Sequence, residues 1–150
     1  MKKYQSGSSL IEVILVTVVV ATVLTALAAS VSMSAKNTSE NKKRVMAASF
    51  VQEILEVFHR ERFTLGWDTF QSTLSNGTYC FNELPTDSTD FVNSSLGECD
   101  EGEVIVDTVH QREVILTILA DEVKVESVVT WMDGDQEKQV DAEQTFKEIN

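Results

Sequence analysis

The chain has 150 residues, of which 43% are hydrophobic and 24% are charged, an inventory that fits about one globular domain. Its 12 basic and 24 acidic residues give a formal net charge of −12, so direct binding to nucleic acid is not expected. Six glycines, one proline and two cysteines exclude a collagen-like, proline-rich or disulfide-dense chain.

The near-neutral mean hydropathy of −0.06 averages two unlike parts of the chain. The first part is an uncharged run from Val13 to Ala35, which follows a short start with Lys2 and Lys3. About 20 apolar helical residues cross a hydrocarbon core of ~30 Å, so we predict a membrane helix with residues 10–31 in the bilayer. By the positive-inside rule, the N-terminus stays cytoplasmic and the residues after the span face outward.

One acidic residue, Glu12, interrupts the apolar run. An unpaired carboxylate in a bilayer is costly, and ionisable residues within spans usually mark a function. A position at the membrane surface, where Glu12 is merely tolerated, is one alternative. A secretory signal peptide is another, because Ala26-Leu27-Ala28 offers a cleavage site and would release a soluble domain.

The string Gly7-Ser8-Ser9-Leu10-Ile11-Glu12-Val13 resembles the prepilin signature of type IV pilins and type II secretion pseudopilins. In that family a membrane peptidase cuts after the Gly that ends a short basic leader, and Glu is the fifth mature residue. The resemblance implies cleavage between Gly7 and Ser8 and N-methylation of Ser8. It also implies that Glu12 pairs with the terminal ammonium of a neighbouring subunit, which makes this charge a register check on assembly.

Two departures from the family pattern favour a minor pilin or pseudopilin over an abundant subunit. Ser8 replaces the usual Phe or Met, and Ala29 stands where major pilins commonly have proline. The implied partners are other pilin subunits, the prepilin peptidase and the pilus assembly platform. The implied location is the inner membrane as a single-pass precursor, and then a cell-surface or periplasmic filament for adhesion, twitching, DNA uptake or protein secretion.

The apolar helix is expected to continue into a soluble amphipathic helix at 36–63, because no Gly or Pro lies between Ser8 and Gly66. Together they predict one helix from about Ser9 to about Arg62, which Gly66 ends. Residues at three- and four-residue intervals form a stripe typical of a core-facing side. These residues are Ala47, Val51, Ile54 and Phe58, with Phe50, Leu55 and Val57 beside them.

The remainder reads as a β-rich segment at 77–146. A short helix is predicted at 67–74, a strand at 78–81 and a polar surface loop at 85–102. Three β-branched strands follow at 103–106, 114–118 and 123–131, and an Asp133-Gly134 turn leads to a last strand at 139–146. The predicted fold is α+β and pilin-like, with the long N-terminal helix on a small antiparallel sheet. Its parts are a leader at 1–7, a transmembrane assembly helix at 8–35 and a head at 36–150.

The two cysteines, Cys80 and Cys99, flank the polar loop. In an exported domain an even pair at this spacing indicates a disulfide, which would contribute roughly 3 kcal/mol in the chain-entropy model. Two unrelated reduced thiols are the alternative.

Acidic clusters are weak candidates for calcium, a cation that takes several oxygen ligands. One comprises Asp133, Asp135 and Glu137, and the other Glu98, Asp100, Glu101 and Glu103. Solvated acidic loops are commoner, so no metal site is expected. His59 and His110 lack Cys or His neighbours at ligand spacing, which favours surface or packing roles. Phosphate loops and nucleophile motifs are missing, so neither an enzyme nor a cofactor is predicted.

The sequence therefore favours a filament subunit. A single-span, membrane-anchored binding module that never polymerises is the main alternative, and it would present the acidic head to a ligand.

Overall fold

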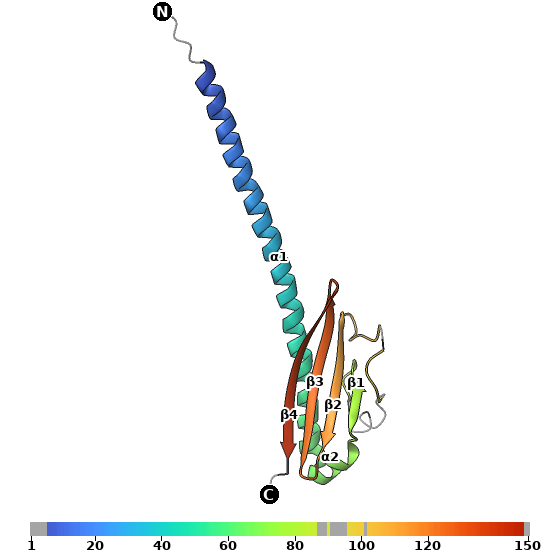
Figure 1. Cartoon of the computed structure of the whole chain (residues 1–150). Helices are drawn as coiled ribbons and strands as arrows, with labels where there is room; N and C mark the ends of the chain where they lie inside the picture. Colours follow the sequence, from blue (N-terminus) through green and yellow to red (C-terminus); the bar gives the residue numbers. More distant parts are fainter. Residues whose placement is uncertain (1–5, 87–89, 91–95, 101, 149–150) are drawn as a thin grey trace, which may run out of the picture. The chain divides into compact units, whose positions relative to one another are not determined.

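The computed structural model describes residues 6–86, 90, 96–100 and 102–148 (Figure 1). The chain divides into two compact units, Met1–Asn41 and Lys42–Asn150. Helix α1, Ser6–Leu65, contributes to both units and confirms the single uninterrupted helix expected from the missing Gly and Pro. Gly66, with φ of 74°, ends it in a conformation that favours glycine.

The second unit combines the last part of α1 with a short helix and a four-stranded antiparallel sheet (Figure 1). The short helix α2 is Trp67–Thr73, and the sheet order is β1-β2-β3-β4. The strands are β1 at Gly77–Cys80, β2 at His110–Ile118, β3 at Glu122–Asp133 and β4 at Gln136–Lys147. The predicted α+β class, with helix against antiparallel sheet, is confirmed.

The core of this unit lies between α1 and one face of the sheet. Alternate residues of β3 point inward, which is the period-2 pattern of a half-buried strand. The predicted helix stripe is buried against them, with Ala47, Val51, Ile54 and Phe58 all at most 2% exposed. Strand residues Val123, Val125, Val129 and Trp131 complete this interior together with Phe70 and Phe146.

The β3–β4 hairpin sets the register of the longest strand pair. Asp133 pairs with Gln136, so its two-residue loop is Gly134–Asp135. Gly134 has a φ of 66°, and a positive φ at the first loop residue matches the twist that a two-residue hairpin needs. The predicted turn at Asp133-Gly134 is therefore found within one residue.

The strand predicted at Glu103–Val106 is wrong. Of the four residues in this run only Ile105 is buried, whereas Val106 is 68% exposed. The chain turns back here: the Ile105 carbonyl accepts the Thr108 amide and hydroxyl at 3.0 and 2.8 Å, and Asp107 has a φ of 61°. A run of β-branched residues thus forms the turn before β2, because its chain direction reverses before any strand can pair with it.

Half of the polar loop predicted at 85–102 lies outside the described part of the chain. Of its described residues, Leu96 forms an isolated antiparallel bridge with Tyr79 of β1.

Candidate functional site

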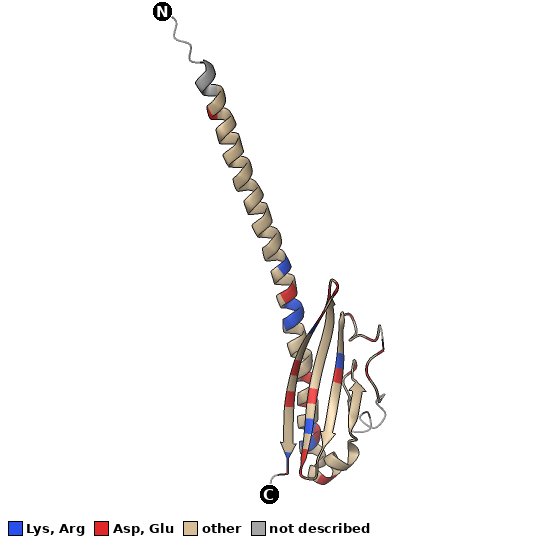
Figure 2. Cartoon of the chain, viewed as in Figure 1, with Lys and Arg blue, Asp and Glu red and all other residues tan. Residues whose placement is uncertain are grey.

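The first unit presents an apolar helix surface with one charge. Among residues 10–35 of α1, Glu12 is the sole charged side chain (Figure 2). The large apolar side chains from Leu10 to Met33 are 50–69% exposed. This segment is long and apolar enough to cross a membrane. An apolar surface of this extent needs lipid or another protein around it.

The threonine hydroxyls of this segment are satisfied within the helix itself. Thr17, Thr22 and Thr25 donate to main-chain carbonyls three or four residues earlier at 2.8–3.0 Å. Such back-bonding leaves no hydroxyl donor of these residues exposed to an apolar environment. Glu12 differs, because within the described part of the chain no hydrogen bond or ion pair involves its carboxylate. It is the charged group of this surface, and an apolar environment would require a partner for it.

The predicted processing residues lie at the beginning of α1. Gly7 and Ser8 have helical backbone, whereas the predicted leader before Ser6 lies outside the described residues. Glu12 follows Ser8 by four residues, about one helical turn.

In the second unit, the predicted disulfide is present between Cys80 at the end of β1 and Cys99. The side chain of Asn82, which follows β1, hydrogen-bonds to β2 and to the segment that precedes β2. Its side-chain oxygen accepts the Arg112 amide at 3.0 Å, and its side-chain nitrogen donates to the Glu103 carbonyl at 2.8 Å. The Glu113 carboxylate accepts the Cys99 amide at 2.8 Å. The connection between β1 and β2 is thus held by one covalent bond and several polar contacts.

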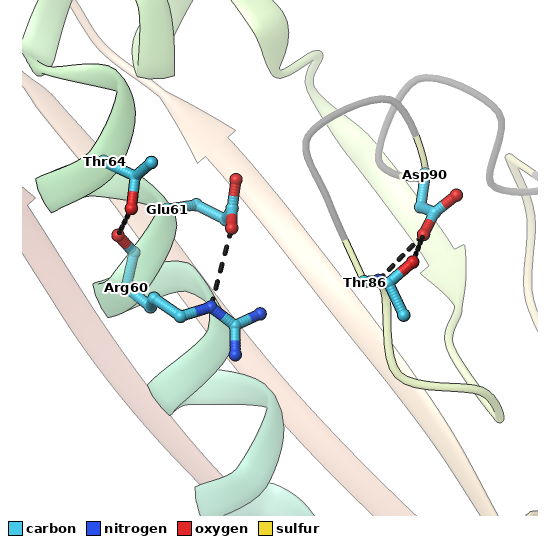
Figure 3. Close-up of polar contacts among 5 residues, drawn as sticks. All are labelled: Arg60, Glu61, Thr64, Thr86 and Asp90. Carbon is cyan, nitrogen blue, oxygen red and sulfur yellow. Dashed lines mark hydrogen bonds and ion pairs between the residues drawn. The ribbon is translucent and has the colours of Figure 1, made fainter.

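An open groove of about 690 Å³ borders the disulfide. Its walls come from the chain after β1, including Phe81 and Pro85, and from the segment before β2, including Gly102 and Val104. Thr86 and Asp90 also line the groove, and the amide and the hydroxyl of Thr86 both donate to the Asp90 carboxylate (Figure 3). The described residues that line it are mainly apolar and acidic, and none of them is cationic.

The calcium candidates do not come together among the described residues. Asp133 forms an ion pair with Lys43 at 3.1 Å. Glu137 lies opposite Met132 in the β3–β4 register, so its side chain is on the other face of the sheet from that of Asp133. Glu101 lies outside the described residues, and the Glu103 carboxylate accepts the Asp100 amide at 3.0 Å. The one group of three potential metal ligands found in the described part is Cys80, Cys99 and Glu103. The sulfurs of the two cysteines are bonded to each other in the disulfide.

Sequence reasoning missed Arg112, whose side chain is 2% exposed within the second unit. Its guanidinium donates to the carbonyls of Phe81 and Phe50 at 2.6 and 3.1 Å and lies 3.8 Å from the Glu53 carboxylate. Burial lowers the pKa of Arg112 to about 10, and the Glu53 charge opposes this shift. Arg112 therefore ties β2 to α1 and to the chain after β1. In the alternating pattern of β2, Arg112 shares the inward face with His110 and Val114, and this position could have indicated its burial.

His110 is also a packing residue rather than part of a ligand cluster. It is 1% exposed, its Nε2 lies 3.1 Å from the Lys43 carbonyl, and its ring packs against Phe50 and Trp131. Burial lowers its pKa, the Lys43 carbonyl raises it, and the Lys43 charge lowers it further. His59 is exposed on α1, and its ring is tilted by 52° against that of Phe63 at a centroid distance of 4.9 Å.

A buried acid, Glu61, lies near the end of α1. The Glu61 side chain is 8% exposed, and its carboxylate lies 3.6 Å from Arg60 Nε (Figure 3). The Thr64 hydroxyl donates to the Arg60 carbonyl at 3.0 Å, which closes the last turn locally. Among the described residues, these two contacts place no further reactive group beside Glu61.

Comparisons of the chain with protein-family models, with curated proteins and with solved structures give no match. The residues themselves therefore carry the functional argument.

Proposed function

We propose that this chain is a structural subunit, a minor pilin or pseudopilin, of a type IV pilus or a related secretion or DNA-uptake filament. The precursor is held in the inner membrane by α1, is cut after Gly7 and is N-methylated at Ser8. It then joins other pilin subunits with the help of the prepilin peptidase and an assembly platform. The observation that carries the proposal is Glu12, the single charge on an exposed apolar helix surface, five residues after Gly7.

The mechanism follows from the cost of that charge. In lipid, an unpaired carboxylate is unfavourable, and pairing it with a cation removes most of the penalty. The terminal ammonium of a neighbouring subunit is such a cation, and cleavage after Gly7 creates it. Transfer of α1 from lipid into a bundle of like helices keeps its apolar side chains covered and gives Glu12 its partner.

The α+β head and the disulfide support an exported subunit. Disulfides persist in oxidising compartments such as the periplasm or the cell surface. The acidic head then faces the outside of the filament or its tip, where it keeps the assembly soluble.

Glu12→Ala and Glu12→Gln test the proposal in the source organism. We expect both variants to remain in the membrane fraction after alkaline extraction, because removing a charge favours insertion. The amount recovered in sheared filaments should fall on the order of tenfold, since the neighbouring ammonium loses its partner.

Thr22→Ala is the matched control, because Thr22 lies on the same apolar segment and its hydroxyl is satisfied within the helix. It should incorporate as the unchanged chain does. If both Glu12 variants enter filaments at the normal level, Glu12 has no role in assembly and the membrane-anchored binding module becomes the better account.

A further inference from the structure

A cluster of cations follows directly after the apolar segment of α1. Residues 36–44, named here the basic segment, contain Lys36, Lys42, Lys43 and Arg44 against one acid, Glu40. The whole segment is helical, and Figure 2 shows its basic residues as the blue turns of α1. No step of the proposed assembly through Glu12 uses these charges.

Three of the four cations have accessible side chains. Lys36, Lys42 and Arg44 are exposed, whereas Lys43 is half-buried and forms the ion pair with Asp133. The exposed cations can therefore contact an outside partner without breaking an interaction of the second unit.

The helix places these cations at the height of a bilayer surface. The uncharged run from Val13 to Ala35 covers about 34 Å at 1.5 Å per residue, compared with a hydrocarbon core of ~30 Å. Lys36 then lies at the lipid headgroups, and Lys42 follows six residues later in the same helix. Long Lys and Arg side chains reach back toward the interface, so both residues are within range of lipid phosphates.

Membrane topology does not explain these cations. The leader lysines Lys2 and Lys3 favour a cytoplasmic N-terminus, but four basic residues follow the span closely, so the positive-inside rule applied to both flanks does not favour the outward orientation of residues 36–44. The Cys80–Cys99 disulfide, however, belongs to an oxidising compartment. Topology therefore does not account for basic residues on the exported side, and we look for a binding partner for them.

We propose that the basic segment binds the phosphates of anionic lipid headgroups at the bilayer surface where the apolar part of α1 ends. Charge complementarity and continuity with the membrane span define this partner, and each cation near an anionic surface contributes favourably. The interaction holds the subunit in the membrane and must be broken when the subunit is extracted. It requires only that α1 crosses a bilayer, so it stands or fails independently of pilus assembly.

Lysine acylation of the full chain in lipid nanodiscs, read out by peptide mass spectrometry, tests this proposal. One set of discs contains phosphatidylglycerol and the other contains neutral phosphatidylcholine. The acylation rates of Lys36 and Lys42 are divided by that of Lys147, whose side chain is 68% exposed and lies outside the basic segment. We expect both ratios to be about fivefold lower in the anionic discs, from ~1 kcal/mol for each cation.

Salt and substitution distinguish lipid binding from other causes. The difference between the two lipids should vanish at 1 M salt, where the screening length is ~3 Å. Lys36→Gln combined with Arg44→Gln should restore part of the Lys42 rate in anionic discs. Arg60→Gln, which removes an exposed cation outside the basic segment, should leave that rate unchanged.

Two results would overturn the proposal. Equal ratios in both lipids would show that the headgroup charge is not recognised. If acylation is already slow in neutral discs and becomes slower as the number of chains per disc rises, the basic segment binds the acidic head of a second copy instead.

Discussion

At the scale of single residues, His110 shows how a buried ring makes the head sensitive to acid. Its Nε2 faces the Lys43 carbonyl of α1, while Phe50 and Trp131 cover the ring. Its Nδ1 is buried without a hydrogen-bond partner in the described part of the chain. A second proton would therefore add an unpaired charge close to the ammonium of Lys43, and burial and this charge together keep the His110 pKa below its usual value.

The lowered pKa of His110 predicts a loss of stability at mildly acidic pH. Above pH 6.5 the ring is neutral in both states; as the pH falls below 6.5, the unfolded chain takes up the proton first and stability decreases. The loss attributable to His110 is at most about 1.4 kcal/mol at pH 5.5, a bound set by the unfolded-state pKa. Urea unfolding in detergent, followed by the fluorescence of Trp67 and Trp131, measures it at pH 8 and pH 5.5.

His110→Phe keeps a ring in the same place and removes the titrating group. It should show a smaller difference between the two pH values than the unchanged chain, whereas His59→Gln, at an exposed position, should not. An identical pH dependence in His110→Phe would exclude His110 as the source.

Residue identity alone did not reveal Arg112. Periodicity places a residue on the inner face of a strand, but a cation there is expected only if carbonyls and an acid converge on it. Those partners come from Phe81 and from α1 residues Phe50 and Glu53, up to 62 positions away in the chain. Glu12 and the two cysteines could be selected from sequence, because a charge within an apolar run and a cysteine pair are local signals.

At the scale of elements, strand prediction succeeded where alternation and pairing agree. Val123 to Trp131 alternate along β3, and the hairpin at Gly134 supplies the partner β4. The run Glu103–Val106 has the same β-branched composition but reverses at Asp107. The sequence cannot show that no neighbouring strand is available to this run, because that depends on how β1 and β2 pair.

The disulfide-closed connection between β1 and β2 predicts a measurable contribution to stability. Cys80→Ser combined with Cys99→Ser should lower the free energy of unfolding by roughly 3 kcal/mol, because a loop of about 20 residues gains entropy in the unfolded state. Equilibrium urea unfolding of the oxidised chain and of the double variant measures the difference.

A reducing agent provides the control for this substitution. Reduced unchanged chain should resemble the double variant, and the reductant should not affect the variant itself. Equal stability of the oxidised and reduced chains would show that the polar contacts of Asn82 and Glu113 hold the connection without the covalent bond.

At the scale of the whole molecule, charge is divided by position along the chain. Residues 64–150 contain 4 basic and 19 acidic residues, whereas residues 36–63 contain 6 basic and 4 acidic ones. The near-neutral mean hydropathy therefore hides an apolar helix, a basic segment and an acidic sheet domain. Each part suits a different environment, namely lipid, the bilayer surface and water.

The proposed function predicts that the mature chain begins at Ser8. The proposed cleavage after Gly7 would remove Lys2 and Lys3, and the formal side-chain charge would change from −12 to −14. N-terminal sequencing of protein purified from the source organism should begin at Ser8, and an intact mass should show whether Ser8 carries a methyl group.

Gly7→Val should leave the leader attached, because a branched side chain replaces the residue at the cut. Ala28→Leu is the matched control and should still begin at Ser8; a start at Met1 in the unchanged chain would favour an anchored module, and a start at Ala29 a secreted domain.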